Sequence, residues 1–320
     1  MRQTEFPYLP KDFVQTADGL IFAVVSYHPH QGKVGCFLRY VSNGDNWQKV
    51  DTLQANRLLS RHHPHYLYKS KQFDAEFHAV DVADIITHHQ PEARLKTLKN
   101  QPEPTDEIEE KLSRLLTILV QFGVDCDFLG LTGSMLIGNQ KAGSDIDLVV
   151  YGREAFHQTR HAVRQAIASG LIEELDLSLM RDNFQRRGGE LNFEEFAWHE
   201  SRKFNKAAID GTKFDIGMVS LPQELEPEHR HYIKQGISTV KATVIDDHRA
   251  FDFPAHYLID NEMTPEVVSF THTYVGQAQV GETIEITGAV ECDSASGQRR
   301  LVVGSTREAI GEYIKVCREL

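Results

Sequence analysis

The first third of the chain contains apolar runs separated by turn residues and one stretch, AEFHAVDV, in which apolar and polar residues alternate; both patterns are typical of β-strands. Two apolar runs, GLIFAVVSYHP and KVGCFLRYV, are separated by a turn at residues 30–32 and predict a hairpin. Strand-like pieces follow at residues 65–69 and 75–82. Residues 1–100 are therefore expected to form a small β-rich N-terminal domain.

The pattern changes after a break that contains Pro102 and Pro104. Apolar residues then recur at steps of three and four, which predicts a helix with Thr105 as its N-cap and an end near Gly123. These apolar residues are Ile108, Leu112, Leu115, Leu116 and Leu119.

Helix and strand patterns alternate through the middle of the chain. The strand-like runs are CDFLGLTG, DIDLVVYG and KFDIGMVSL, with a short segment at residues 135–138 and a predicted helix over residues 154–169 between them. This order is typical of a compact domain with helices packed on a sheet. We place that domain at residues 101–222, and residues 170–212 resemble an insertion within it.

After Pro222 the chain turns β-rich again, with STVKATVID, ETIEITGAVE and RRLVVGS as predicted strands. Ser305 and Glu308 have the spacing of a capping box, which predicts a short helix through Ile314. Residues 223–320 are thus expected to form a β-rich C-terminal domain with one helix. The predicted fold class is α+β, with a central mixed sheet and its helices between two β-rich domains.

Composition excludes several classes of protein. The 320 residues are 41% hydrophobic and 25% charged, as in globular proteins, and no run of about 18 apolar residues occurs. The N-terminus lacks the layout of a signal peptide, so we expect a cytoplasmic protein without membrane contact. A net charge of −12 argues against non-specific binding of duplex DNA, and four widely spaced cysteines indicate neither a disulfide framework nor a cysteine zinc site.

The candidate chemistry lies in the run that begins Asp145-Ile146-Asp147. Alternate residues of a strand share a face, so the two carboxylates are expected to project together while Ile146 faces the core. Paired carboxylates repel each other, and a divalent cation relieves that repulsion. Oxygen ligands of this kind suit Mg²⁺ or Mn²⁺ held jointly with substrate phosphates.

Two further features complete the predicted site. Gly133 has no side chain, so its backbone can approach a triphosphate, and the Ser134 hydroxyl can donate to phosphate oxygens. Asp215, in the next strand-like run, is the best candidate for a third carboxylate, provided that its strand lies beside DIDLVV. Asp210 and Asp176 are its competitors.

These residues carry a resemblance to a known superfamily. Gly133-Ser134, Asp145-x-Asp147 and then Asp215 resemble the signature of the DNA polymerase β-type nucleotidyltransferases, which transfer a nucleoside monophosphate from an NTP to a hydroxyl. The resemblance implies that the first pair binds phosphate and that the three aspartates are catalytic metal ligands. The whole chain is also similar to archaeal-type predicted nucleotidyltransferases, through the blocks DGLIFAVVSYHP, FLRYV, RKFN, GTKFDI and LVVGS.

Ser144 and Arg202 are two further candidates for binding the nucleotide. Ser144 directly precedes the first aspartate, and Arg202 belongs to a basic cluster with Lys203 and Lys206 before the third aspartate. On a helix, Arg202 and Lys206 would share a face and could reach the triphosphate or the acceptor. The alternative is a solvated helix face paired with nearby glutamates.

Half of the 16 histidines precede residue 90, including the groups His28-Pro-His30, His62-His63-Pro-His65 and His88-His89. Their spacing matches no helical H-x-x-x-H motif, and no cysteine supports them. The sequence therefore favours no zinc site there.

The sequence as a whole predicts a magnesium- or manganese-dependent nucleotidyltransferase. ATP or another NTP would be the nucleotide donor, and the acceptor hydroxyl would belong to RNA, a protein or a small molecule. The alternative is a non-catalytic nucleotide- or RNA-binding module that keeps this fold.

Overall fold

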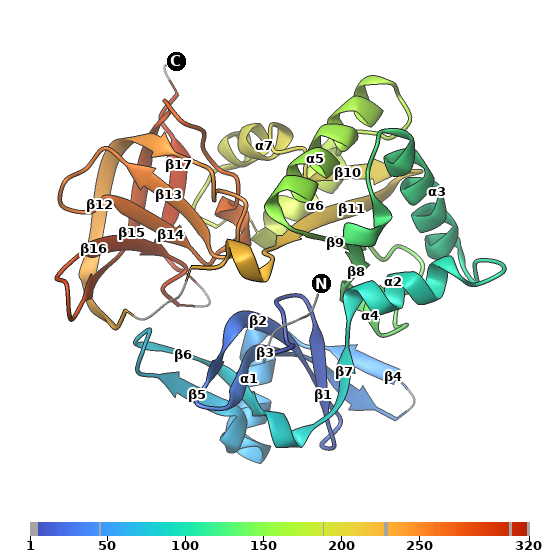
Figure 1. Ribbon diagram of the computed structural model, residues 1–320, viewed down its shortest axis with the longest axis horizontal. Helices are drawn as coiled ribbons and strands as arrows, with labels where there is room; N and C mark the ends of the chain where they lie inside the picture. Colours follow the sequence, from blue (N-terminus) through green and yellow to red (C-terminus); the bar gives the residue numbers. More distant parts are fainter. Residues whose placement is uncertain (1–5, 45, 188, 227–229, 307–308, 319–320) are drawn as a thin grey trace. The chain divides into compact units, whose positions relative to one another are not determined.

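The protein forms two compact units, shown in Figure 1. The structure is a computed structural model that describes residues 6–44, 46–187, 189–226, 230–306 and 309–318. One unit holds the chain up to Ser70 together with Glu76–Glu173 and Ala207–Glu224, and the other holds Lys71–Ala75, Glu174–Lys206 and the chain from Leu225 onward. Both units contain helices and sheets, so the predicted α+β class is confirmed.

The first unit begins with a β-sheet in the order β5-β6-β3-β2-β1-β7, with β4 also paired to β3. The predicted hairpin is present as β2 and β3, which pair through His30 and Lys33 next to the turn. Apolar side chains from this sheet pack against α1, a helix that the sequence analysis did not predict. The elements are β1 (Phe13–Thr16), β2 (Leu20–His30), β3 (Lys33–Asn43), β4 (Asn46–Lys49), α1 (Thr52–His62), η1 (Pro64–Tyr66), β5 (Leu67–Ser70), β6 (Ala75–Asp81), η2 (Val82–Asp84) and β7 (Ile85–His89).

The same unit contains a mixed sheet in the order β10-β11-β9-β8. β9 runs parallel to β11 and antiparallel to β8. Helix α5 packs against β9 and β11, and α3 packs against α5. The elements are α2 (Pro91–Lys99), α3 (Glu107–Gln121), η3 (Cys126–Phe128), β8 (Leu129–Leu131), α4 (Gly133–Leu136), β9 (Ile146–Tyr151), α5 (Arg153–Ala168), β10 (Lys206–Ile209), β11 (Thr212–Val219) and η4 (Pro222–Glu224).

Helix α3 buries the apolar face that its periodicity predicts, but its N-cap is Asp106 rather than Thr105. The Asp106 carboxylate accepts a hydrogen bond from the Glu109 amide at 2.9 Å. The Glu109 carboxylate in turn accepts hydrogen bonds from the amide and hydroxyl of Thr105. Thr105, the residue before the N-cap, therefore stabilises the start of the helix through Glu109.

The second unit is built on a sheet in the order β12-β13-β14-β16-β15-β17, which closes on itself because β12 also pairs with β15. Helices α6 and α7 belong to this unit, and Phe196 of α7 is buried in its core. The elements are α6 (Leu177–Arg187), α7 (Phe193–Ser201), β12 (Tyr232–Asp246), β13 (Ala255–Ile259), β14 (Glu266–Ser269), η5 (His272–Tyr274), β15 (Thr283–Asp293), β16 (Arg299–Val303) and β17 (Tyr313–Val316).

The predicted C-terminal helix through Ile314 is wrong. Ile314 lies in strand β17, fully buried and paired with Ile286 of β15. The Ser305 amide donates to the Glu312 carboxylate at 2.9 Å, and the Ser305 hydroxyl contacts the same group. Ser305 thus closes a loop before a strand, and its predicted capping partner Glu308 lies outside the described residues.

Among the described residues, no helix is both long and apolar enough to cross a membrane.

Candidate active site

Asp145 and Asp147 lie at the start of β9, Asp145 directly before it and Asp147 as its second residue. Both are half-buried, whereas Ile146 and Leu148 are completely enclosed. The alternation predicted from the sequence is therefore confirmed, and the two carboxylates leave the strand on the face opposite the apolar residues.

Asp215 occupies the matching position on the neighbouring strand β11. The two strands run parallel, and their register places Asp215 directly beside Asp147. Neighbouring strands lie about 4.8 Å apart, so the parallel pairing gathers three carboxylates at one place on the sheet. The prediction that the Asp215 strand lies beside DIDLVV is thus confirmed.

Lys213 supplies a positive charge within this group. Its Nζ lies 3.0 Å from Oδ2 of Asp145 and 3.3 Å from Oδ2 of Asp215, and its side chain is only 3% exposed. A buried ammonium is stable only when it is paired, so these contacts explain its burial. The sequence analysis missed Lys213, although the Lys-x-Asp spacing on a strand places both side chains on one face.

Gly133 lies against the Asp147 carboxylate, at the first position of α4. A Cβ at this position would sit 2.1 Å from Oδ2 of Asp147, and the glycine φ is +68°. Backbone contacts fix the same arrangement, because the Thr132 amide donates to the Asp147 carbonyl at 2.9 Å. Both steric space and backbone conformation therefore require glycine here.

Ser134 and Ser144, also predicted to bind the nucleotide, lie next to Gly133 and Asp145 in the sequence. Ser134 follows Gly133 in α4 and is half-buried. Ser144 lies in the turn before Asp145, where its Oγ accepts a hydrogen bond from the Lys141 amide at 2.9 Å. Its hydroxyl thus stabilises the turn that leads into β9.

The turn that precedes β1 contributes a second lysine to the same face of β11. Lys11 has a φ of +77°, and its Nζ lies 3.7 Å from the point that a Cβ on Gly217 would occupy. Gly217 follows Asp215 by two residues and therefore shares its face of the sheet. Thr132 anchors the Lys11 backbone, because its Oγ1 donates to the Lys11 carbonyl at 2.7 Å.

Tyr40 brings the N-terminal sheet close to Asp147. The Tyr40 side chain is 3% exposed and packs with Phe13, Ile21 and Leu136. Burial raises the pKa of its hydroxyl, and the negative charge of Asp147 raises that pKa further, against the opposing effect of Arg39. The N-terminal sheet thus packs through Tyr40 against Leu136 of α4, the helix that begins at Gly133, and no local motif indicates this contact.

The two competitors for the third carboxylate have other roles. Asp210 lies in the turn between β10 and β11, where both of its oxygens accept hydrogen bonds from Arg114 at 2.8 and 2.9 Å. Asp176 accepts a hydrogen bond from the Leu179 amide at the start of α6. Each carboxylate thus stabilises a turn or a helix end.

The predicted basic cluster belongs to the second unit. Helix α7 ends at Ser201, so Arg202 and Lys206 do not share a helix face as the sequence analysis considered. Arg202 lies over the Trp198 ring and donates to Glu282 at 2.5 Å, and Lys203 and Lys206 both contact Glu200. The two lysines therefore pair with a glutamate, as the alternative expected, but the group is buried and follows the helix rather than forming a solvated helix face.

Comparison with known proteins identifies the central part of the chain. Residues 105–205 match the model of the nucleotidyltransferase domain family, a range that includes Gly133, Asp145 and Asp147 and ends before β11. The chain is also 34% identical over 335 residues to the uncharacterized protein MJ1086 of Methanocaldococcus jannaschii, covering 96% of this chain and 98% of that protein. No solved structure matches. The predicted nucleotidyltransferase domain and the predicted similarity to an archaeal protein are thus both confirmed.

Replacing Gly133 with alanine is expected to destabilise the protein more than the same change at Gly138. Both glycines have a positive φ, of +68° and +65°, so both variants suffer the backbone cost of roughly 1–2 kcal/mol. Only at position 133 would the new methyl group collide with Asp147. Urea unfolding of the two variants measures the difference, and equal losses of stability would show that the carboxylate moves aside without cost.

Proposed function

Because the chain belongs to the family of the archaeal protein MJ1086 and carries a nucleotidyltransferase domain, we propose that it transfers a nucleoside monophosphate from an NTP to a hydroxyl acceptor. The observation that supports this most is the convergence of Asp145, Asp147 and Asp215 on adjacent strands, beside a glycine that leaves room for a carboxylate. The acceptor would be an RNA end, a protein or a small molecule.

The three carboxylates suit divalent metal ions. Their oxygens are ligands of the kind that Mg²⁺ and Mn²⁺ prefer, and the position of Lys213 between two of them indicates that the group attracts positive charge. We propose that Asp145 and Asp147 hold the ions with the triphosphate and that Asp215 completes the site of the attacking hydroxyl. When bound, such ions polarise the phosphate and lower the pKa of the attacking hydroxyl.

The remaining residues of the proposed site bind and orient the nucleotide. Gly133 allows the backbone to approach the triphosphate, and the Ser134 hydroxyl donates to a phosphate oxygen. The ammonium groups of Lys11 and Lys213, both on the Asp215 face of β11, offset the negative charge of the phosphates. Charges held in place before substrate binds require little reorganisation during the reaction, and electrostatic stabilisation of this kind is a large part of many enzymes' rate enhancement.

Ser144 and Arg202 are also proposed to bind the nucleotide. Ser144 is one residue from Asp145, but its Oγ already accepts a hydrogen bond within its own turn. Arg202 already pairs with Glu282 and would have to exchange that partner for a phosphate. The β-rich parts that precede and follow the central domain in the sequence are proposed to bind the acceptor.

Asp145→Asn and Asp147→Asn are each expected to reduce nucleotide transfer by at least roughly 100-fold while the protein remains folded, because an amide keeps the side-chain shape but not the charge. Release of pyrophosphate from each NTP, with Mn²⁺ and total cellular RNA or lysate as acceptor, measures the activity. Asp127→Asn is the matched control, since Asp127 is exposed and lies outside the site. Wild-type turnover in both site variants would contradict the proposal.

Asp215→Ala is expected to lower kcat far more than it weakens NTP binding, because Asp215 is assigned to the attacking hydroxyl rather than to the triphosphate. Asp210→Ala is the control from the same hairpin, and its activity should stay close to that of the wild type. Steady-state kinetics and NTP calorimetry on both variants separate the two effects. An inactive Asp210→Ala protein beside an active Asp215→Ala protein would assign the third carboxylate to the turn.

Binding of ATP is expected to be at least about tenfold tighter in Mg²⁺ than in EDTA, since three carboxylates otherwise repel a triphosphate. Calorimetry in the two buffers measures this difference. Equal affinities together with no pyrophosphate release from any NTP would favour the non-catalytic binding module.

A further inference from the structure

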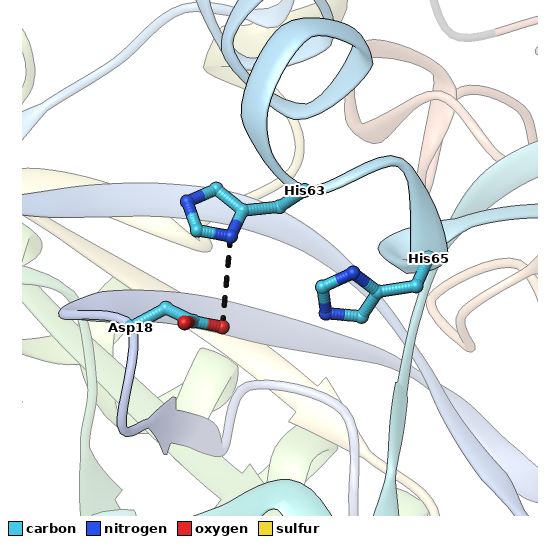
Figure 2. Close-up of side chains that lie close together, drawn as sticks. All are labelled: Asp18, His63 and His65. Atoms are coloured by element: carbon cyan, nitrogen blue, oxygen red, sulfur yellow. Dashed lines mark ion pairs between the residues drawn. The ribbon is translucent and has the colours of Figure 1, made fainter.

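Three potential metal ligands meet in the N-terminal part of the chain, in a group that the proposed transfer reaction does not use. Figure 2 shows Asp18, His63 and His65, each directed toward the others. One ligand atom from each residue lies within 4.8 Å of the ligand atoms of the other two. The residues come from two separate segments, the turn between β1 and β2 and the chain that follows α1.

Two helices fix the backbone around His63 and His65. His63 is the C-cap of α1, and its amide donates to the Leu59 carbonyl of that helix. Pro64 then opens the short helix η1, which includes His65 and ends at Tyr66. Because proline restricts the chain between the two histidines, their separation is largely set before any ligand binds.

Tyr66 contacts both Asp18 and His65 and helps to orient them. Its side chain is 2% exposed and packs against Phe22 in the core of the sheet, at 5.0 Å between ring centroids. Its hydroxyl donates to Oδ2 of Asp18 at 2.7 Å, and its ring lies 4.0 Å from the ring of His65. A buried donor to a carboxylate ligand is the usual outer support of a metal site.

The distance between Asp18 and His63 suits a shared ion better than a direct hydrogen bond. Nδ1 of His63 lies 3.6 Å from Oδ2 of Asp18, beyond the usual hydrogen-bond range. Two ligands of a tetrahedral zinc ion, each bound at about 2.1 Å, lie about 3.4 Å apart. His65 is exposed, and one of its ring nitrogens lies within 4.8 Å of the ligand atoms of both other residues.

We propose that Asp18, His63 and His65 bind a transition-metal ion of the zinc type. Two imidazoles and one carboxylate favour such an ion, whereas the all-carboxylate site on β9 and β11 favours Mg²⁺. Three protein ligands leave a fourth position for water or an exchangeable ligand. The bound ion links the β1–β2 turn to the end of α1 and thereby stabilises the N-terminal sheet.

Calorimetry of the full chain with ZnCl₂, in excess Mg²⁺ to occupy the carboxylate site, tests this proposal. The wild type should show one tight site, and His63→Ala and His65→Ala should each weaken that site about 100-fold or more. His62→Ala is the matched control, because His62 is an exposed neighbour outside the group, and should bind as the wild type does. Tyr66→Phe keeps the buried ring and should weaken binding roughly tenfold.

Thermal unfolding provides the second measurement. One equivalent of Zn²⁺ should raise the Tm of the wild type and of His62→Ala, but not that of His63→Ala or His65→Ala. An anomalous signal at the zinc edge among the three residues would place the ion directly. Unchanged zinc affinity in both alanine variants, or loss of the site when Mg²⁺ is added, would overturn the proposal without affecting the proposed transfer activity.

Discussion

The parallel pairing of β9 and β11 is the constraint on which the candidate active site depends. In the parallel register of these strands, Asp147 lies beside Asp215. Asp145 comes two residues before Asp147 and therefore projects from the same face. Carboxylates at such distances repel one another unless a cation lies among them. Lys213 of β11 supplies such a cation, because its ammonium group contacts both Asp145 and Asp215 and reduces their repulsion.

The same constraint explains why glycine precedes Ser134 and why the N-terminal sheet approaches this point. The Asp147 carboxylate occupies the space that a Cβ on residue 133 would need. Thr132 precedes Gly133. Its amide donates a hydrogen bond to the Asp147 carbonyl of β9, and its hydroxyl donates one to the Lys11 carbonyl. The segment at residues 132–133 therefore connects the aspartate strand β9, helix α4 and the turn that precedes β1.

Much of the central domain could be predicted from the sequence, because its signals are local. The apolar spacing of α3, the alternation in β9 and the composition of β11 each reflect one element packed against one core. Lys213 was missed because its closer contact is with Asp145, which precedes the neighbouring strand, and Lys11 because it approaches β11 from a distant turn. The C-terminal helix was predicted wrongly, since Ser305 contacts Glu312 across a loop and the burial of Ile314 in a strand outweighs a capping pattern.

The long interval between Asp147 and Asp215 also has a structural cause. The chain leaves the first unit after Glu173, contributes α6 and α7 to the core of the second unit, and returns at Ala207 to form most of β10 and all of β11. Residues such as Phe196 are buried there among the side chains of the closed sheet, so the insertion-like stretch is part of another core. Sequence periodicity identifies a helix but does not indicate which core the helix packs into. The position of Asp215 beside Asp147 therefore follows only from the pairing of β11 with β9.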